Sequence, residues 1–191
     1  VQPGFVQGMV QYLGFDDRAA GYVASAEMFG NAATTGAMTF AAQHFNWRRV
    51  IAWSLAIMVV TNLACTLVRD VTPFAALRFA TGIGAGGLIS LSFTAIGLTR
   101  RPDRNFGYLI MWVLTYGASA LLAMPTAYRL ARFAGVLWFF PLFPLVALPW
   151  LKYFPVSGES SVQVEKDAVN LSASSKGLAL AAMFCYFLAQ G

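Results

Sequence analysis

The stretch PFAALRFATGIGAGGLISLSFTAIGL at residues 73–98 contains a single charged side chain, that of Arg78. A helix needs about 20 predominantly apolar residues to cross a bilayer, because its backbone polar groups must be satisfied inside the segment. The stretch therefore predicts a membrane-spanning α-helix. Similar runs occur at 19–42, 50–68, 106–127 and 133–151. Together they predict an all-α protein, a polytopic transmembrane helix bundle with five complete spans.

The composition of the 191-residue chain argues against an ordinary soluble domain. Hydrophobic residues make up 58% of it and charged residues only 11%, against roughly 45–50% and about 25% in a soluble domain. The 13 Lys and Arg residues outnumber the 8 Asp and Glu residues, but they are scattered in small groups between apolar runs. A lipid bilayer is therefore the expected surrounding, and nucleic acid is not an expected partner.

The two ends of the chain carry apolar runs that are too short to cross a bilayer, at 3–15 and 177–191. We interpret them as the tail of one helix and the start of another, so that the bundle is truncated at both ends. The expected organisation is a transmembrane bundle at 1–154 and a polar cytoplasmic linker at 155–176, followed by the start of a further helix at 177–191.

The basic residues in the loops predict the orientation, because cytoplasmic loops carry an excess of Lys and Arg. If the loop at 46–49 is cytoplasmic, eight basic residues lie on that side and four on the other. The eight are Arg48, Arg49, Arg100, Arg101, Arg104, Lys152, Lys166 and Lys176, and the four are Arg18, Arg69, Arg129 and Arg132. We therefore expect a multi-pass protein, located in a bacterial inner membrane, with the loop at 46–49 in the cytoplasm.

Glu27 lies inside the apolar run at 19–42, about 13 Å from Arg18 and close to the bilayer midplane. An ionisable group at that depth costs roughly 2.5 kcal/mol or more, so it is a functional candidate that faces the bundle interior or water. Asn31, Thr35 and Thr39 follow it at spacings of four and form a polar ridge on one helix face. The alternative is that this ridge only packs against a neighbouring helix.

Arg78 follows Thr72 and Pro73, which are expected to form the N-cap and first turn of its helix. This spacing places Arg78 about 8 Å inside the outer end. One interpretation is that its side chain extends to the membrane surface. The other is that its guanidinium faces a central cavity, where it binds a substrate carboxylate through two hydrogen bonds or pairs with Glu27.

Residues 82–87 read GIGAGG and match the dinucleotide-binding pattern GxGxxG. That pattern requires a preceding strand, and this one lies inside an apolar span, so we expect Gly82 and Gly86 to allow a close helix contact instead. Cys65 and Cys185 lie in apolar runs and are expected to be small core residues. The chain contains no GxSxG, HExxH or metal-ligand pattern, so it predicts no enzyme, no cofactor and no metal site.

Aromatic residues near the span ends, Trp47 and Tyr128 among them, are expected to anchor the helices at the membrane surface. His44, the only histidine, lies beside Asn46, Trp47, Arg48 and Arg49. A histidine next to arginines at a span end is more often a solvated loop residue than a proton carrier.

Taken together, these features resemble the N-terminal half of a major facilitator superfamily permease, from the end of helix 1 to the start of helix 7. Residues 13–16 (LGFD) and 21–27 (GYVASAE) resemble the beginning of the family's helix 2, and the pattern R-x-x-x-G-x-G-x-G of helix 4 is present from Arg78 to Gly86. The family's loop signature G-x-L-x-D-R-x-G-R-R is retained only in its closing Arg48 and Arg49. His44 replaces its aspartate, Phe45 its first arginine, and Phe40 and Trp47 its glycines.

The resemblance implies a fold of twelve helices in two halves that rock around a midplane site. It implies a secondary transporter, a proton-coupled symporter of a small organic solute, with an organic anion as one possibility. The implied partners are this solute, protons, the bilayer and a C-terminal half of the same chain. Together with the depth arguments above, we expect Glu27 to serve in proton coupling and Arg78 and Asn31 in substrate binding, and the resemblance places His44, Arg48 and Arg49 at an inner gate. A membrane sensor or assembly protein that keeps the fold without transporting is the alternative.

Overall fold

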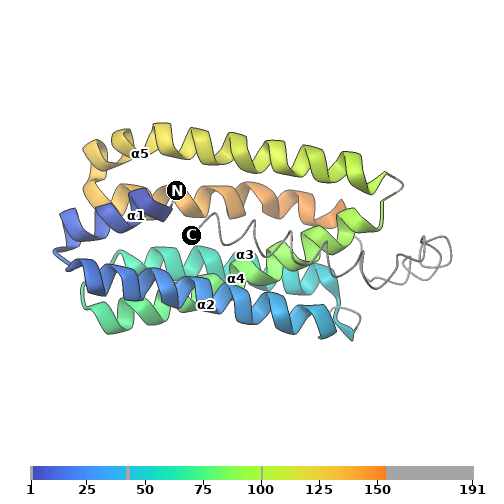
Figure 1. The fold of residues 1–191 in the computed structure, drawn as a ribbon, viewed down its shortest axis with the longest axis horizontal. Helices are drawn as coiled ribbons and strands as arrows, with labels where there is room; N and C mark the ends of the chain where they lie inside the picture. Colours follow the sequence, from blue (N-terminus) through green and yellow to red (C-terminus); the bar gives the residue numbers. More distant parts are fainter. Residues whose placement is uncertain (1, 42–43, 100, 154–191) are drawn as a thin grey trace, which may run out of the picture. The chain divides into compact units, whose positions relative to one another are not determined.

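The computed structural model describes residues 2–41, 44–99 and 101–153, and each regular element in them is a helix. The elements are α1 (Gln2–Gly8), η1 (Met9–Leu13), α2 (Asp17–Ala41), α3 (Trp47–Cys65), α4 (Val71–Gly97), α5 (Pro102–Ala147) and η3 (Leu148–Tyr153), as drawn in Figure 1. The all-α bundle is confirmed. The expected linker at 155–176, the helix start at 177–191 and Cys185 lie outside the described residues.

Three helical segments among the described residues are long and apolar enough to cross a membrane: α3, α4 and the part of α5 from Pro102 to Leu130. Helix α2 has 25 residues, which is also long enough. Polar side chains such as Glu27 and Asn31 make it less apolar than the other three. The lengths and compositions of the helices therefore support three of the five expected spans, those at 50–68, 73–98 and 106–127.

The expected break between two spans at 128–132 falls within α5, which is 46 residues long. At this point Arg132 has a φ of 53°, in the left-handed region that non-glycine residues rarely adopt. In Figure 1 the ribbon of α5 doubles back where its colour passes from yellow to orange. A straight helix of this length would span about 69 Å, more than twice the thickness of a hydrocarbon core. The reversal gives α5 two antiparallel limbs.

Side chains before two of the helices cap their first turns. The backbone N–H of Ala19 donates to Asp16 Oδ1 at 2.7 Å, and that of Arg49 donates to Asn46 Oδ1 at 3.2 Å. Helix α4 begins at Val71 with Asp70 as its N-cap, so the expected N-cap at Thr72 is wrong. Pro73 still falls in the first turn, where a missing N–H leaves no helical hydrogen bond unmade.

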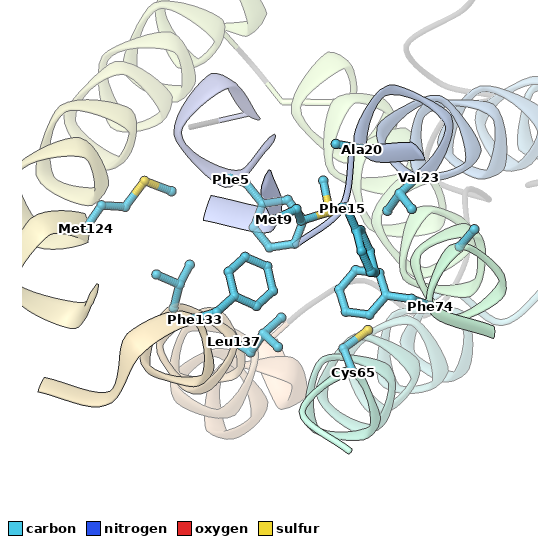
Figure 2. Packing of buried hydrophobic residues seen from close by; sticks show 12 residues of the cluster. Phe5, Met9, Phe15, Ala20, Val23, Cys65, Phe74, Met124, Phe133 and Leu137 are labelled. Atoms are coloured by element: carbon cyan, nitrogen blue, oxygen red, sulfur yellow. The ribbon is translucent and has the colours of Figure 1, made fainter. Parts of the chain in front are cut away.

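A hydrophobic core fills the end of the bundle that includes α1, η1 and the reversal of α5. Figure 2 shows Phe5, Met9 and Phe133 gathered between the helices, with Phe74 and Cys65 beside them. The ring centroids of Phe5 and Phe133 are 5.2 Å apart, within the range of favourable aromatic pairs. Cys65 is buried in this cluster, as expected for a small core residue.

A second hydrophobic cluster lies at the beginning of α3 and contains Trp47, which is only 2% exposed. The expectation that Trp47 anchors the helix at the membrane surface is therefore wrong. Tyr128 is half-buried; its hydroxyl donates to the Gly4 carbonyl at 2.9 Å and its ring stacks on Tyr12. The position of an aromatic residue near a span end does not reveal whether it faces lipid or a neighbouring helix.

Candidate functional site

Glu27 and Arg78 form a buried ion pair between α2 and α4. Arg78 Nε donates to Glu27 Oε2 at 3.1 Å, and Arg78 Nη2 donates to Glu27 Oε1 at 2.6 Å. The two side chains are only 15% and 4% exposed, in that order. Two parallel charge-assisted hydrogen bonds strengthen the pair and also determine its geometry. The interpretation that Arg78 extends to the membrane surface is wrong, and its pairing with Glu27 is what the structure contains.

Two further helices contribute to the surroundings of the guanidinium. Asn62 on α3 accepts a hydrogen bond from Arg78 Nη1 at 3.0 Å, and its own amide donates to the Met58 carbonyl at 2.7 Å. The ring of Phe5 on α1 lies 4.6 Å from Arg78 Cζ, a cation–π distance. The Cys65 thiol lies close enough to interact with Arg78 and Glu27. Arg78 is thus the point where α1, α2, α3 and α4 meet.

Glycines allow α4 to approach α2 closely enough for this pair to form. A Cβ added at Gly82 would collide with the backbone oxygen of Glu27, and one at Gly86 would lie 2.5 Å from that of Asn31. Arg78 precedes Gly82 by four residues and therefore shares its helix face. The expected close contact at Gly82 and Gly86 is confirmed, and it brings the α2 backbone next to the face that carries Arg78.

A different face of α4 packs against α3 through its other glycines. A Cβ at Gly84 would lie 2.8 Å from the Ser54 backbone oxygen, and one at Gly87 would lie 2.6 Å from the Ser54 hydroxyl. Nearby, the hydroxyls of Thr61 and Thr81 are 2.8 Å apart and share a buried hydrogen bond. In an apolar surrounding, such packing and interhelical hydrogen bonds hold helices together. They fix the position of α3 and hence of Asn62.

Asn31 lies one helical turn after Glu27, in the contact between α2 and α4. Its side-chain oxygen accepts a hydrogen bond from the Thr35 hydroxyl at 3.3 Å, and that hydroxyl also lies 3.5 Å from the Gly86 carbonyl. The polar ridge therefore includes helix-packing contacts as well as the ion pair. The side chain of Thr39 is outside the described part of the structure.

The residues expected at the inner gate lie far from the ion pair. His44 precedes α3, and Arg48 and Arg49 lie in its first turn. Asn62 is 15 residues after Trp47, which corresponds to about 22 Å along the helix. The structure therefore places these three residues in a separate region, next to the cluster around Trp47, and does not bring them together with Glu27.

The six residues at 82–87 that match a dinucleotide-binding pattern lie in the middle of α4. No strand precedes them in the described part of the chain, so the requirement of the nucleotide pattern is not met. Among the described residues no group of three or more His, Cys, Asp or Glu side chains could hold a metal ion. The polar groups at the ion pair are the Glu27 carboxylate, the Arg78 guanidinium, the Asn62 amide and the Cys65 thiol.

A sequence model of the Major Facilitator Superfamily matches residues 1–191. The chain belongs to this superfamily. The resemblance seen in the sequence is confirmed, and the protein is an integral membrane protein of a transporter family. No curated protein and no solved structure matches the chain.

Within this superfamily member, the sequence identified two of the residues at the ion pair and missed three others. Asn62 had a usable signal, because an amide in an apolar span must find a hydrogen-bond partner. Phe5 and Cys65 had none, since apolar residues in apolar segments are unremarkable until their neighbours are known. Long-range packing alone brings these two to Arg78.

Proposed function

We propose that this superfamily member transports a small organic anion together with a proton by alternating access. The observation that carries the proposal is the buried pair in which both oxygens of Glu27 occupy the guanidinium of Arg78. Planar guanidinium groups bind carboxylates in this two-bond geometry, whether the carboxylate belongs to the protein or to a solute. The Arg78 site is therefore already shaped for a carboxylate.

The pair couples anion binding to proton binding through charge. While Glu27 is ionised, it neutralises Arg78 and competes with a solute carboxylate for the same N–H groups. A proton on Glu27 removes its negative charge and weakens its hold on the guanidinium. The solute can then take its place, and the site remains neutral overall. Leaving either partner of a buried pair uncompensated is strongly unfavourable, so the two binding events occur together.

Alternating access requires the site to face each side of the membrane in turn. In this proposal Asn31 contributes to solute binding one turn below Glu27, and His44, Arg48 and Arg49 close the cytoplasmic side. A C-terminal half of the same chain would supply the opposite wall, because transporters of this kind bind their substrates between two halves. The location we propose is a bacterial inner membrane.

The second candidate is a membrane sensor or assembly protein with the same fold. It is favoured by the segment at 40–49, where Phe40, His44, Phe45 and Trp47 replace residues of the family signature. The two candidates differ in a measurable property, because only a transporter moves solute across a sealed membrane.

A screen of ligands followed by transport tests the proposed function. The intact protein in detergent is heated with carboxylates, sugars or amines, and a ligand that binds only the folded state raises the unfolding temperature. We expect stabilisation by carboxylates, and uptake of the same compounds into vesicles when a pH gradient is imposed. Stabilisation by neutral solutes alone would contradict anion recognition, and binding without uptake would favour the sensor.

The orientation can be tested with single cysteines in a background without Cys65 and Cys185. Cysteines at Asn46 and Asp103 should react with a membrane-impermeant thiol reagent only after the membrane is opened, because these positions are expected in the cytoplasm. A cysteine at Asp70 should react in intact cells. Labelling of all three positions from outside would contradict the orientation.

Substituting Arg78 with lysine separates recognition by two hydrogen bonds from attraction by charge alone. In the Glu27→Gln background, where the ionised competitor is absent, Arg78→Lys should weaken binding of the carboxylate found in the screen by roughly tenfold or more, because lysine lacks the planar fork. Binding is measured by calorimetric titration. Arg129→Lys, at an exposed arginine outside the site, is the matched control. Equal affinities for the Arg78→Lys and Arg78 proteins would rule out two-bond recognition.

A further inference from the structure

A cavity of about 160 Å³ lies at the end of the bundle where α3 ends and α5 doubles back. Tyr12 of η1, Cys65 at the end of α3, Arg69 in the following loop and Arg132 and Phe133 of α5 are among its lining residues. This end is the one we expect to face the outside. The cavity is much smaller than the 300–1,000 Å³ of drug-sized pockets, so its ligand contains few atoms.

The charged residues that line this cavity are both arginines, Arg69 and Arg132. Both are exposed, and no acidic residue lines the cavity. Within the described residues neither guanidinium forms an ion pair, in contrast to Arg78. An anion that enters the cavity would be attracted by both positive charges.

The backbone at Arg132 gives a second indication of a binding role. This residue has a φ of 53°, the one positive φ at a non-glycine residue in the described part of the chain. Such conformations persist only where the surroundings hold them, and they cluster at ligand-binding positions. At this turn the left-handed conformation coincides with an arginine that lines a cavity.

The same cavity reaches the neighbourhood of the ion pair through Cys65. Cys65 is among the lining residues, and its thiol also interacts with Arg78 and Glu27. The apolar side chains of Phe133 and Leu137 form part of the wall. A solute held at the two exposed arginines would therefore lie next to the buried pair while remaining open to solvent.

We propose that this cavity is a separate binding site for a small organic dicarboxylate, with Arg69 and Arg132 as its ligand-binding residues. Two carboxylates match two guanidiniums, and a four-carbon diacid suits a space of this size. Hydroxyl groups of Tyr12 and Thr66 on the lining add polar character. Binding at this site stands independently, and its role as a capture site for the transported anion rests on the proposed function.

The test uses the intact protein in phosphatidylcholine nanodiscs and calorimetric titration with succinate. The expected result is saturable binding that Arg69→Gln and Arg132→Gln each weaken by roughly tenfold or more, as expected for the loss of a charge-assisted hydrogen bond. Arg129→Gln removes an exposed arginine that does not line the cavity and should leave the affinity unchanged. Succinamide, which has the same shape without charge, should not bind.

Three other outcomes of these titrations would contradict the proposed cavity site. No succinate binding, or unchanged affinity in Arg69→Gln, overturns the proposed site. Arg69 lies in an exposed loop, so its substitution keeps the test valid even if Arg132→Gln fails to fold. A lipid headgroup as the true ligand would appear as phosphatidylglycerol that co-purifies with the protein but is lost in both variants, together with no succinate binding. Binding that is lost only when Arg78 is changed to Met refutes the cavity site and leaves the proposed function intact.

Discussion

Replacing Glu27 with glutamine should abolish accumulation of solute driven by a pH gradient while leaving exchange of solute across the membrane intact. Glutamine keeps the size of the side chain and an oxygen that can accept a hydrogen bond from Arg78, but it cannot bind or release a proton at neutral pH. It resembles the protonated carboxyl, so the guanidinium stays available to a solute carboxylate. Transport without proton coupling can equilibrate a solute but cannot concentrate it.

The measurement compares two assays in vesicles that contain the intact protein. One follows net uptake after a pH gradient is imposed, and the other follows exchange of labelled for unlabelled solute without a gradient. Asp17→Asn is a matched control, because Asp17 is an exposed carboxylate at the start of the same helix, and it should retain both activities. If the Glu27→Gln protein still concentrates solute when a pH gradient is imposed, another group carries the proton.

Replacing Arg78 with methionine should lower the stability of the protein by about 3–5 kcal/mol, because it leaves the Glu27 carboxylate in an apolar surrounding without its charge partner. The double variant Glu27→Gln, Arg78→Met should recover most of this loss, since an uncharged amide needs no counter-ion. A buried pair replaced as a whole is often neutral for stability.

The measurement is thermal unfolding in detergent. It compares the original protein with Glu27→Gln, Arg78→Met and the double variant, which together form a double-mutant cycle. Asn62→Leu offers a comparison, because it removes one neutral acceptor of Arg78 and leaves the ion pair in place. The Asn62→Leu variant should lose less stability than Arg78→Met, roughly 1–3 kcal/mol. If the double variant is no more stable than Arg78→Met, the pair does not behave as a unit and the loss comes from packing around the arginine.

The sequence predicted much of the fold because membrane helices have a strong local signal. Long apolar runs must form helices in lipid, where no water can satisfy the backbone. Charges inside such runs are expensive, so Glu27 and Arg78 stand out as candidates by their positions in the chain. The boundaries were predicted less well, because the end of a helix depends on single caps such as Asp70 and on turns such as the one at Arg132.

The identity of the helices, the glycine contact of Gly82 and Gly86, and the two charged residues of the site were thus determined by the sequence itself. Tertiary structure alone decided which partner Arg78 takes, because pairing between residues 51 positions apart depends on how α2 and α4 are rotated and how closely they approach. It also brought Asn62 and Phe5 to the same guanidinium and turned Trp47 inward. Composition and spacing describe one helix at a time, whereas these contacts arise between helices.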